Sequence, residues 1–127
     1  MAIELNHTIV HADDKAVSAR WLAQLFDLPP PIPFGPFMVV KTANGVSLDF
    51  IDSGGDKVAS RHFAFLVSDA EFDAIFVRVE AQGIRYWADP MGKVEGQINT
   101  HFGGRGCYFR DPSGHWLEII TKPYEMS

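Results

Sequence analysis

Hydrophobic and polar positions follow the same order twice along this chain. Residues 5–10 and 61–67 are predicted strands with a histidine near the start, and residues 45–51 and 114–120 are predicted strands with a carboxylate in the middle. The repeated order predicts one structural unit used twice, with a histidine early and a carboxylate late in each copy. These four side chains are His7, His62, Asp49 and Glu118.

Each copy is expected to continue with a helix. Asp13 or Asp14 can cap the first helix, and the spacing of Ser68 and Glu71 fits a capping box for the second. Both segments carry an apolar stripe at helical spacing, which indicates that each helix packs one face on a sheet. The stripe residues are Val17, Trp21, Leu22, Leu25 and Phe26 in the first helix and Phe72, Ile75, Phe76 and Val79 in the second.

The remainder of each copy is predicted to form strands. Residues 53–56 are the expected linker between the copies, and residues 89–104 are an expected long loop. A copy is therefore a strand, a helix and two or three further strands, in which the helix covers one sheet face and leaves the other free. The further strands are expected at residues 32–34, 37–41 and 46–52, and at residues 84–88, 106–110 and 116–121.

Glu118 lies inside an apolar run that is expected to be buried on both sides. An ionised carboxylate buried without a partner costs several kcal/mol, so Glu118 must be paired, protonated or bound to a metal. A salt bridge to a distant arginine is the alternative to a metal. Alternation places Glu118 on the face of Trp116 and Ile120, and sends His115 to the opposite face, where a structural role is expected.

Composition excludes several classes of protein. With 127 residues, 46% hydrophobic and 21% charged, the chain has the composition of one ordinary globular domain. Its net charge of −5 argues against a nucleic-acid partner, and no apolar run approaches the length of a membrane span. The N-terminus lacks a signal-peptide pattern, and the single Cys107 cannot form an internal disulfide, so a cytoplasmic location is expected.

Three segments resemble the vicinal oxygen chelate superfamily: residues 5–7, 61–65 and 106–118, the last with its Asp-Pro-Ser-Gly-His turn. That superfamily contains glyoxalase I, the fosfomycin-resistance thiol transferases, the extradiol dioxygenases and the bleomycin-resistance proteins. The resemblance implies an α+β fold, the glyoxalase/bleomycin resistance/dihydroxybiphenyl dioxygenase fold. In it two βαβββ modules, here residues 1–52 and 61–122 of a single domain 1–127, curl a mixed sheet into a cup around one metal.

The resemblance also implies a ligand set. Carried over by position, His7, His62 and Glu118 are the metal ligands, and Asp49 stands where glyoxalase I has a fourth ligand, normally glutamate. Because Asp49 is one methylene shorter, a ligand, a catalytic base beside the metal and a plain surface carboxylate all remain open for it. Without a thiolate ligand, the cofactor can be iron, manganese, nickel, cobalt or zinc.

Four further side chains are candidates for the mouth of a substrate pocket, against a default of surface loop or core. Cys107 is not expected to be a nucleophile, because nothing in the sequence lowers the pKa of its thiol. The substrate-binding candidates are Trp87, His101, Arg105 and Tyr108.

The sequence thus indicates a metal-dependent enzyme of the glyoxalase and fosfomycin-resistance type, a lyase, isomerase or thiol transferase. Its substrate is expected to be a small molecule that chelates the metal through two neighbouring oxygens. One alternative is an extradiol ring-cleaving dioxygenase, and another is a bleomycin-type protein that binds a drug without catalysis. A homodimer is expected, with sites shared between chains as in short members of the superfamily.

Overall fold

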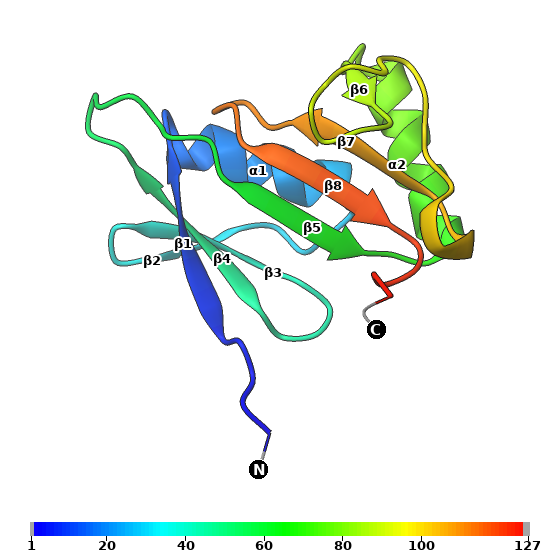
Figure 1. Ribbon diagram of the computed structural model, residues 1–127. Coiled ribbons are helices and arrows are strands. Elements are labelled where there is room, and N and C mark those ends of the chain that lie inside the picture. The colour runs from blue at the N-terminus through cyan, green and yellow to red at the C-terminus, as the bar shows by residue number, and fades with distance from the viewer. Residues whose placement is uncertain (1, 126–127) are drawn as a thin grey trace. The chain divides into compact units, whose positions relative to one another are not determined.

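The computed structural model describes residues 2–125, and its internal contacts divide the chain into two compact units. The first unit extends to Ala59 and the second begins at Ser60. Each unit contains one four-stranded mixed sheet, and the elements follow the order strand, helix and three strands in both (Figure 1). The predicted α+β class with a duplicated βαβββ unit is therefore confirmed, and neither sheet closes into a barrel. Among the described residues no helix is both long and apolar enough to span a bilayer.

The sheet of the first unit has the order β1-β4-β3-β2. The first strand pairs parallel with the last, and the other two pairings are antiparallel. The tight turn before the last strand uses Gly45, whose φ of 83° favours glycine. The elements are β1 (His7–Ala12), α1 (Lys15–Leu25), β2 (Ile32–Phe34), β3 (Phe37–Lys41) and β4 (Ser47–Asp52).

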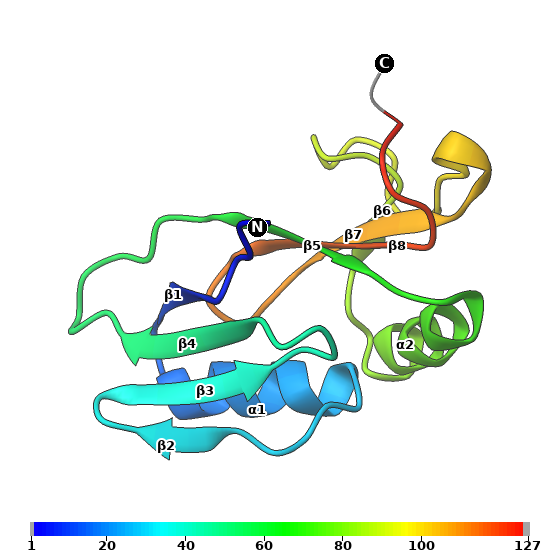
Figure 2. The same ribbon diagram turned by 90° about the horizontal axis from the view of Figure 1, so that it is seen from below.

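Helix α1 begins after Asp14, whose carboxylate accepts hydrogen bonds from the backbone N–H groups of Ala16 and Val17 at 3.0 and 3.2 Å. It lies along β3 and β4 (Figure 2). The predicted stripe was wrong at Val17, which is 48% exposed. The buried face is shifted by one position and includes small residues, which let the helix approach the sheet closely. Its buried residues are Ser18, Ala19, Leu22, Ala23 and Leu25.

The second unit repeats the topology with the order β5-β8-β7-β6, and β5 is parallel to β8. The strand expected over residues 84–88 is only two residues long, because the backbone N–H of Ala88 turns away and donates to the carbonyl of Val94. The elements are β5 (His62–Leu66), α2 (Asp69–Ala81), β6 (Tyr86–Trp87), the short 3₁₀ helix η1 (His101–Gly103), β7 (Gly106–Arg110) and β8 (Trp116–Ile120).

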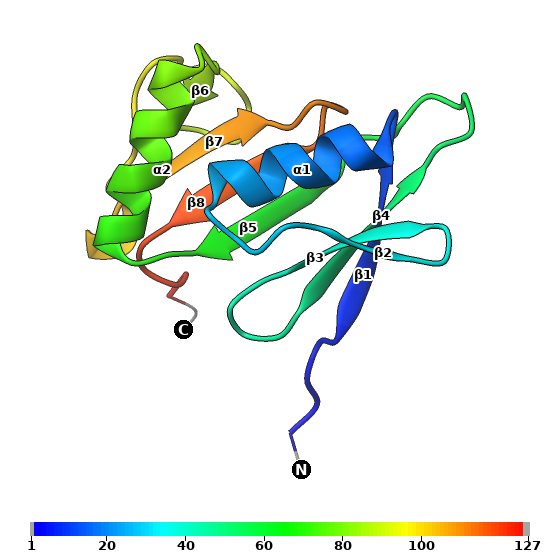
Figure 3. The ribbon, with the colours of Figure 1, turned by 180° about the vertical axis from the view of Figure 1, so that it is seen from behind.

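Helix α2 begins with the predicted capping box. The Ser68 hydroxyl accepts from the backbone N–H of Glu71, and the Glu71 carboxylate accepts from the backbone N–H of Ser68. The helix runs beside β7 (Figure 3) and buries Phe72, Ile75 and Val79, as its stripe predicted. This helix therefore covers the sheet face opposite Glu118.

The turn between β7 and β8 is fixed by two buried polar side chains. The Asp111 carboxylate accepts from the backbone N–H groups of Ser113 and His115 at 3.0 and 2.8 Å. His115 is buried, accepts from the backbone N–H of Arg61 through Nδ1 at 3.0 Å, and meets the Phe63 ring edge-on. This histidine ties the start of β5 to the turn, which is a structural role.

Burial raises the pKa of the Asp111 carboxyl above its ordinary value. The folded protein therefore binds this proton more tightly than the unfolded chain does. The stabilisation is complete below about pH 4 and is lost as the pH rises through the folded-state pKa. We expect the wild-type free energy of unfolding, measured with urea from pH 3 to 7, to fall relative to that of Asp111→Asn across this range. Asp56→Asn, in the exposed linker, is the control, and an equal slope in all three proteins would contradict the prediction.

Candidate functional site

His62 and Glu118 meet on the helix-free face of the second sheet. They lie on the parallel strands β5 and β8, and His62 Nε2 is 3.0 Å from Glu118 Oε1. The glutamate side chain is 2% exposed and the histidine side chain 46% exposed. The buried carboxylate therefore has a histidine as its partner, and among the described residues no lysine or arginine forms an ion pair with it.

The backbone fixes the proton position on His62. Its Nδ1 lies 3.0 Å from the carbonyl oxygen of Trp116. Because a carbonyl only accepts, Nδ1 donates to it, and Nε2 is left facing Glu118. Either a proton on Nε2 or a cation between Nε2 and Oε1 joins the two groups. Metal bonds to nitrogen and oxygen of about 2.0–2.2 Å at a right angle place the two donors roughly 3 Å apart. The pair thus fits two adjacent ligands of a divalent metal.

Two phenols surround the same carboxylate. The Tyr124 hydroxyl lies 2.8 Å from Glu118 Oε1 and 2.9 Å from Oε2. Burial, and then hydrogen bonding to Glu118, raises the pKa of Tyr124. Burial, followed by hydrogen bonding to Tyr124 and Glu118, raises the pKa of Tyr108 far above its usual range. Both phenols are therefore protonated at neutral pH and available as hydrogen-bond donors.

An aromatic surface extends from this pair along the sheet. The Tyr108 ring stacks between His62, at a centroid distance of 5.9 Å, and Trp116, at 5.8 Å. Trp116 also packs against Trp87 at 5.1 Å, and the Arg110 guanidinium lies 4.6 Å from the Trp116 ring centroid. Flat rings beside the His62–Glu118 pair are suited to contact with a planar ligand.

The first unit carries the other two candidates on one face of its own sheet. In the register of β1 and β4, His7 is opposite Ser47, and Ile9 is opposite Asp49. His7 Nδ1 lies 2.6 Å from the side-chain oxygen of Asn6, and the half-buried Asp49 carboxylate accepts from the Ser47 hydroxyl at 3.0 Å. Both candidates line a pocket of about 480 Å³ whose wall is otherwise mainly apolar. The apolar lining residues are Ile9, Ile32, Phe34, Phe37 and Val39.

Each unit therefore supplies one histidine and one carboxylate. Within either unit, as far as residues 2–125 describe it, no three His, Cys, Asp or Glu side chains gather as a metal-binding cluster. The set His7, His62 and Glu118 draws on both units and stays a prediction.

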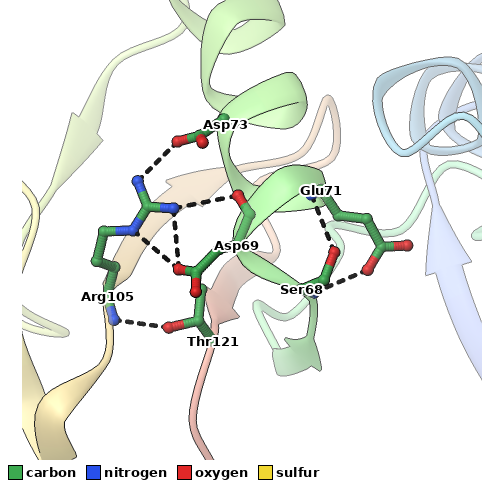
Figure 4. A network of polar contacts seen from close by, with 6 residues as sticks. All are labelled: Ser68, Asp69, Glu71, Asp73, Arg105 and Thr121. Atoms are coloured by element: carbon green, nitrogen blue, oxygen red, sulfur yellow. Dashed lines mark hydrogen bonds and ion pairs between the residues drawn. The ribbon is translucent and has the colours of Figure 1, made fainter.

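Arg105 lies on the other side of the second sheet from Glu118. Its guanidinium forms ion pairs with Asp69 at 3.0 Å and Asp73 at 2.7 Å (Figure 4). It also lies 4.5 Å from the centroid of the Phe72 ring. Hydrogen bonding to Asp73 raises the pKa of this arginine. These contacts give Arg105 a structural role at the start of α2, and its predicted contact with a substrate stays a prediction.

The other pocket candidates divide between the sheet face and a loop. Tyr108 and Trp87 are buried on the Glu118 side, whereas His101 is exposed on η1 beside Phe102. Burial, followed by the negative charge of Glu118, raises the pKa of the Cys107 thiol to about 12, so it stays protonated and unreactive at neutral pH.

Sequence reasoning missed three residues of these faces. Arg110 shares the strand alternation of Tyr108, so the period of two was a signal for it. Asn6 precedes the predicted ligand His7 directly, and a short acceptor next to a histidine was also a visible signal. Tyr124 follows the last strand, and no periodic pattern marks it.

Comparisons with known proteins identify the family of this chain. The family model of the Glyoxalase/Bleomycin resistance protein/Dioxygenase superfamily matches residues 4–119. The solved structure of Oxidase ChaP-H1 is similar to this chain with 56% sequence identity and a TM-score of 0.95, covering 98% of this chain and 100% of that one. Oxidase ChaP-H2 is 52% identical, with a TM-score of 0.94 and coverage of 98% and 97%.

Two proteins with lower similarity to this chain are a fosfomycin resistance protein and a metallothiol transferase. The fosfomycin resistance protein FosX from Mesorhizobium loti, at 24% identity, has a TM-score of 0.70 and coverage of 97% and 95%, which is a likeness of fold. Metallothiol transferase FosB from Shouchella clausii (strain KSM-K16) is 37% identical over 60 residues, which is 47% of this chain. The chain covers 37% of the length of that curated relative.

The His62–Glu118 pair generates a prediction about metal content. Glu118→Ala should reduce bound metal at least tenfold, because one ligand is lost and His62 Nε2 loses its companion. Elemental analysis after supplementation with each candidate ion measures this, with Glu125→Ala as the control. Affinity should also fall on acidification, since each histidine must be neutral to bind. Wild-type protein that retains no ion from any supplement would contradict the prediction.

Proposed function

The chain belongs to the Glyoxalase/Bleomycin resistance protein/Dioxygenase superfamily, and within it we propose a metal-dependent enzyme that oxidises a small molecule. The observation that carries the proposal is the 56% identity to Oxidase ChaP-H1 over almost the whole of both chains. The sequence alone favoured the glyoxalase and fosfomycin-resistance type, with oxygen chemistry as an alternative. The oxidase relatives shift our proposal to the oxidative branch.

The proposed ligands are His7, His62 and Glu118, a set of two histidines and one carboxylate. A divalent metal held by such a set leaves positions open for two neighbouring substrate oxygens, and iron(II) or manganese(II) would also permit reaction with dioxygen. Nickel, cobalt and zinc bind the same donors, but they suit isomerisation or thiol addition rather than oxidation.

The side chains around the pair have separate roles in this proposal. Tyr108 and Trp116 provide a flat surface that orients the substrate and excludes water. The indole N–H of Trp116 is buried and, among the residues described, has no hydrogen-bond partner, so it is a donor for a substrate oxygen. The Asp49 carboxylate, on the His7 face of the first unit, is the proposed base that takes a proton from a substrate hydroxyl.

Metal-dependent thiol transfer is the second candidate. It is supported by the 37% identity to Metallothiol transferase FosB, which extends over 60 residues. The shorter match gives it less weight than the oxidase relatives have.

Oxygen consumption tests the oxidative proposal. Metal-free protein is loaded anaerobically with iron(II) or manganese(II) and mixed with aerated catechols or with the matching monophenols. We expect oxygen uptake with the catechols, because only they offer two neighbouring oxygens. Conversion of a hemithioacetal, or of an epoxide with a thiol, in the absence of any oxygen uptake would favour the second candidate instead.

Asp49→Asn is the matched variant for this assay. If Asp49 is the base, metal content stays at the wild-type level and turnover falls about 10²-fold or more. A loss of metal would make Asp49 a ligand, and unchanged metal content with unchanged turnover would remove both roles. Asp56→Asn controls for the loss of one negative charge.

We further propose that the chain acts as a single functional domain and forms a homodimer. Exposed apolar side chains on the sheet face of the first unit, such as Phe34 at 71% exposure, support an interface. In the proposed dimer the first unit of one chain completes the site of the second unit of its partner. The sole cysteine supports a reducing compartment such as the cytoplasm.

Complementation tests whether sites are shared. His7→Ala and Glu118→Ala chains are unfolded together and refolded as a mixture. If His7 of one chain and Glu118 of the other build one site, each heterodimer has one intact site and activity returns. If each site lies within one chain, every site retains a lesion and the mixture stays inactive. A monomer in light scattering at micromolar concentration would end the proposal.

A further inference from the structure

We propose that Tyr124 is a positioning residue for Glu118, and that its hydroxyl holds the carboxylate in the orientation that binds metal. This inference rests on the proposed function, because it assigns Tyr124 a part in the same site. Tyr124 contacts Glu118 alone among the proposed ligands, so it acts through that residue. The C-terminal segment beyond β8 thereby becomes part of the candidate site.

The two carboxylate oxygens have different surroundings. Oε1 faces His62 Nε2 at 3.0 Å, and the Tyr124 hydroxyl is within reach of both oxygens. A phenol has one proton and makes one strong hydrogen bond at a time. The Tyr124 oxygen lies 2.8 Å from Oε1 and 2.9 Å from Oε2, so the phenol spans both oxygens of the carboxylate. In either hydrogen bond the phenol restrains the rotation of the carboxylate beside Nε2.

The segment that carries Tyr124 is itself anchored. The Thr121 hydroxyl accepts from the backbone N–H of Arg105 at 2.8 Å, and the Thr121 backbone N–H donates to the Arg105 carbonyl at 3.0 Å. A β-carbon on Gly104 would lie 2.6 Å from Lys122 and 2.7 Å from Thr121, so the segment rests directly on this glycine. The Tyr124 ring then packs against Phe102 at 5.5 Å. These contacts hold the segment in place and thereby position the Tyr124 hydroxyl next to Glu118.

Burial makes the phenol necessary. Glu118 is 1% exposed, so solvent does not replace a lost donor, and the remaining phenol, Tyr108, already hydrogen-bonds to Glu118 and Tyr124. A buried carboxylate oxygen without its hydrogen bond loses stabilisation and gains freedom to rotate away from His62. Hydrogen-bond partners of metal-ligating carboxylates typically contribute 10- to 100-fold to metal affinity.

Calorimetric titration of the full-length, metal-free protein with cobalt(II) and with zinc(II) tests this role. Tyr124→Phe removes the hydroxyl and retains the ring against Phe102. We expect its dissociation constant to rise 10- to 100-fold for both ions, and the visible absorption of bound cobalt(II) to change because the carboxylate binds differently. Activity at saturating metal should recover in large part. The matched control is Tyr86→Phe, which removes a hydroxyl from the α2 side of the sheet, where Tyr86 meets Phe76.

Each outcome decides the inference. Wild-type affinity or tighter binding in Tyr124→Phe, or an equal loss in Tyr86→Phe, would overturn the positioning role and leave the proposed function standing. Wild-type protein that binds neither ion would overturn both. Truncation after Pro123 provides a second variant, and it should reproduce the weakened binding of Tyr124→Phe. A truncated protein that folds and binds metal normally would also refute the role.

Discussion

The buried carboxylate of Glu118 is the constraint on which the rest of the second unit depends. It sits on β8, a central strand with β5 on one side and β7 on the other, where an uncompensated charge is not tolerated. Compensation comes from three directions: His62 on one neighbouring strand, Tyr108 on the other, and Tyr124 from the segment that follows. A stability argument alone would favour an apolar residue at this position. The proposed function gives this buried charge a purpose, as a metal ligand.

The two units share a topology but differ in how they treat their helix-free sheet faces. In the second unit this face is filled with stacked rings and a sequestered charge. In the first unit it is a pocket of about 480 Å³, with His7 exposed and Asp49 half-buried among apolar side chains. The two units thus share a backbone pattern but differ in their side chains. The second unit holds His62 and Glu118 in a preorganised arrangement, and the first unit leaves an open pocket. In the proposed function, the preorganised half would supply two of the metal ligands and the open half would admit the substrate.

Strand alternation was the most reliable guide from the sequence. A period of two placed Glu118 with Trp116 and sent His115 to the opposite face, and both placements hold because sheets have two sides only. Applied to residue 105, the same rule groups it with Cys107 and Phe109 on the α2 side, where the structure has its ion pairs with Asp69 and Asp73. The capping box of α2 was equally predictable from the sequence, because it depends on four consecutive residues.

What the sequence could not reveal depends on tertiary contact. The stripe of α1 was misplaced because small residues such as Ala19 and Ala23 carry little hydrophobic signal, yet they allow the closest approach to a sheet. The strand near Trp87 was too long because a loop bridge to Val94 ends the pairing early. Tyr124 lies outside the helices and strands, so no periodic pattern predicts its position. It reaches Glu118 because the segment after β8 packs on Gly104.

The hydrogen bond that orients His62 ends on the main chain. Its acceptor is the carbonyl of residue 116, and a carbonyl survives every replacement of the side chain attached to it. The Trp116 indole packs against Trp87 and Tyr108 and takes no part in the hydrogen bond that orients the histidine. A replacement of this side chain would therefore alter the aromatic face of the sheet and leave the acceptor of His62 in place.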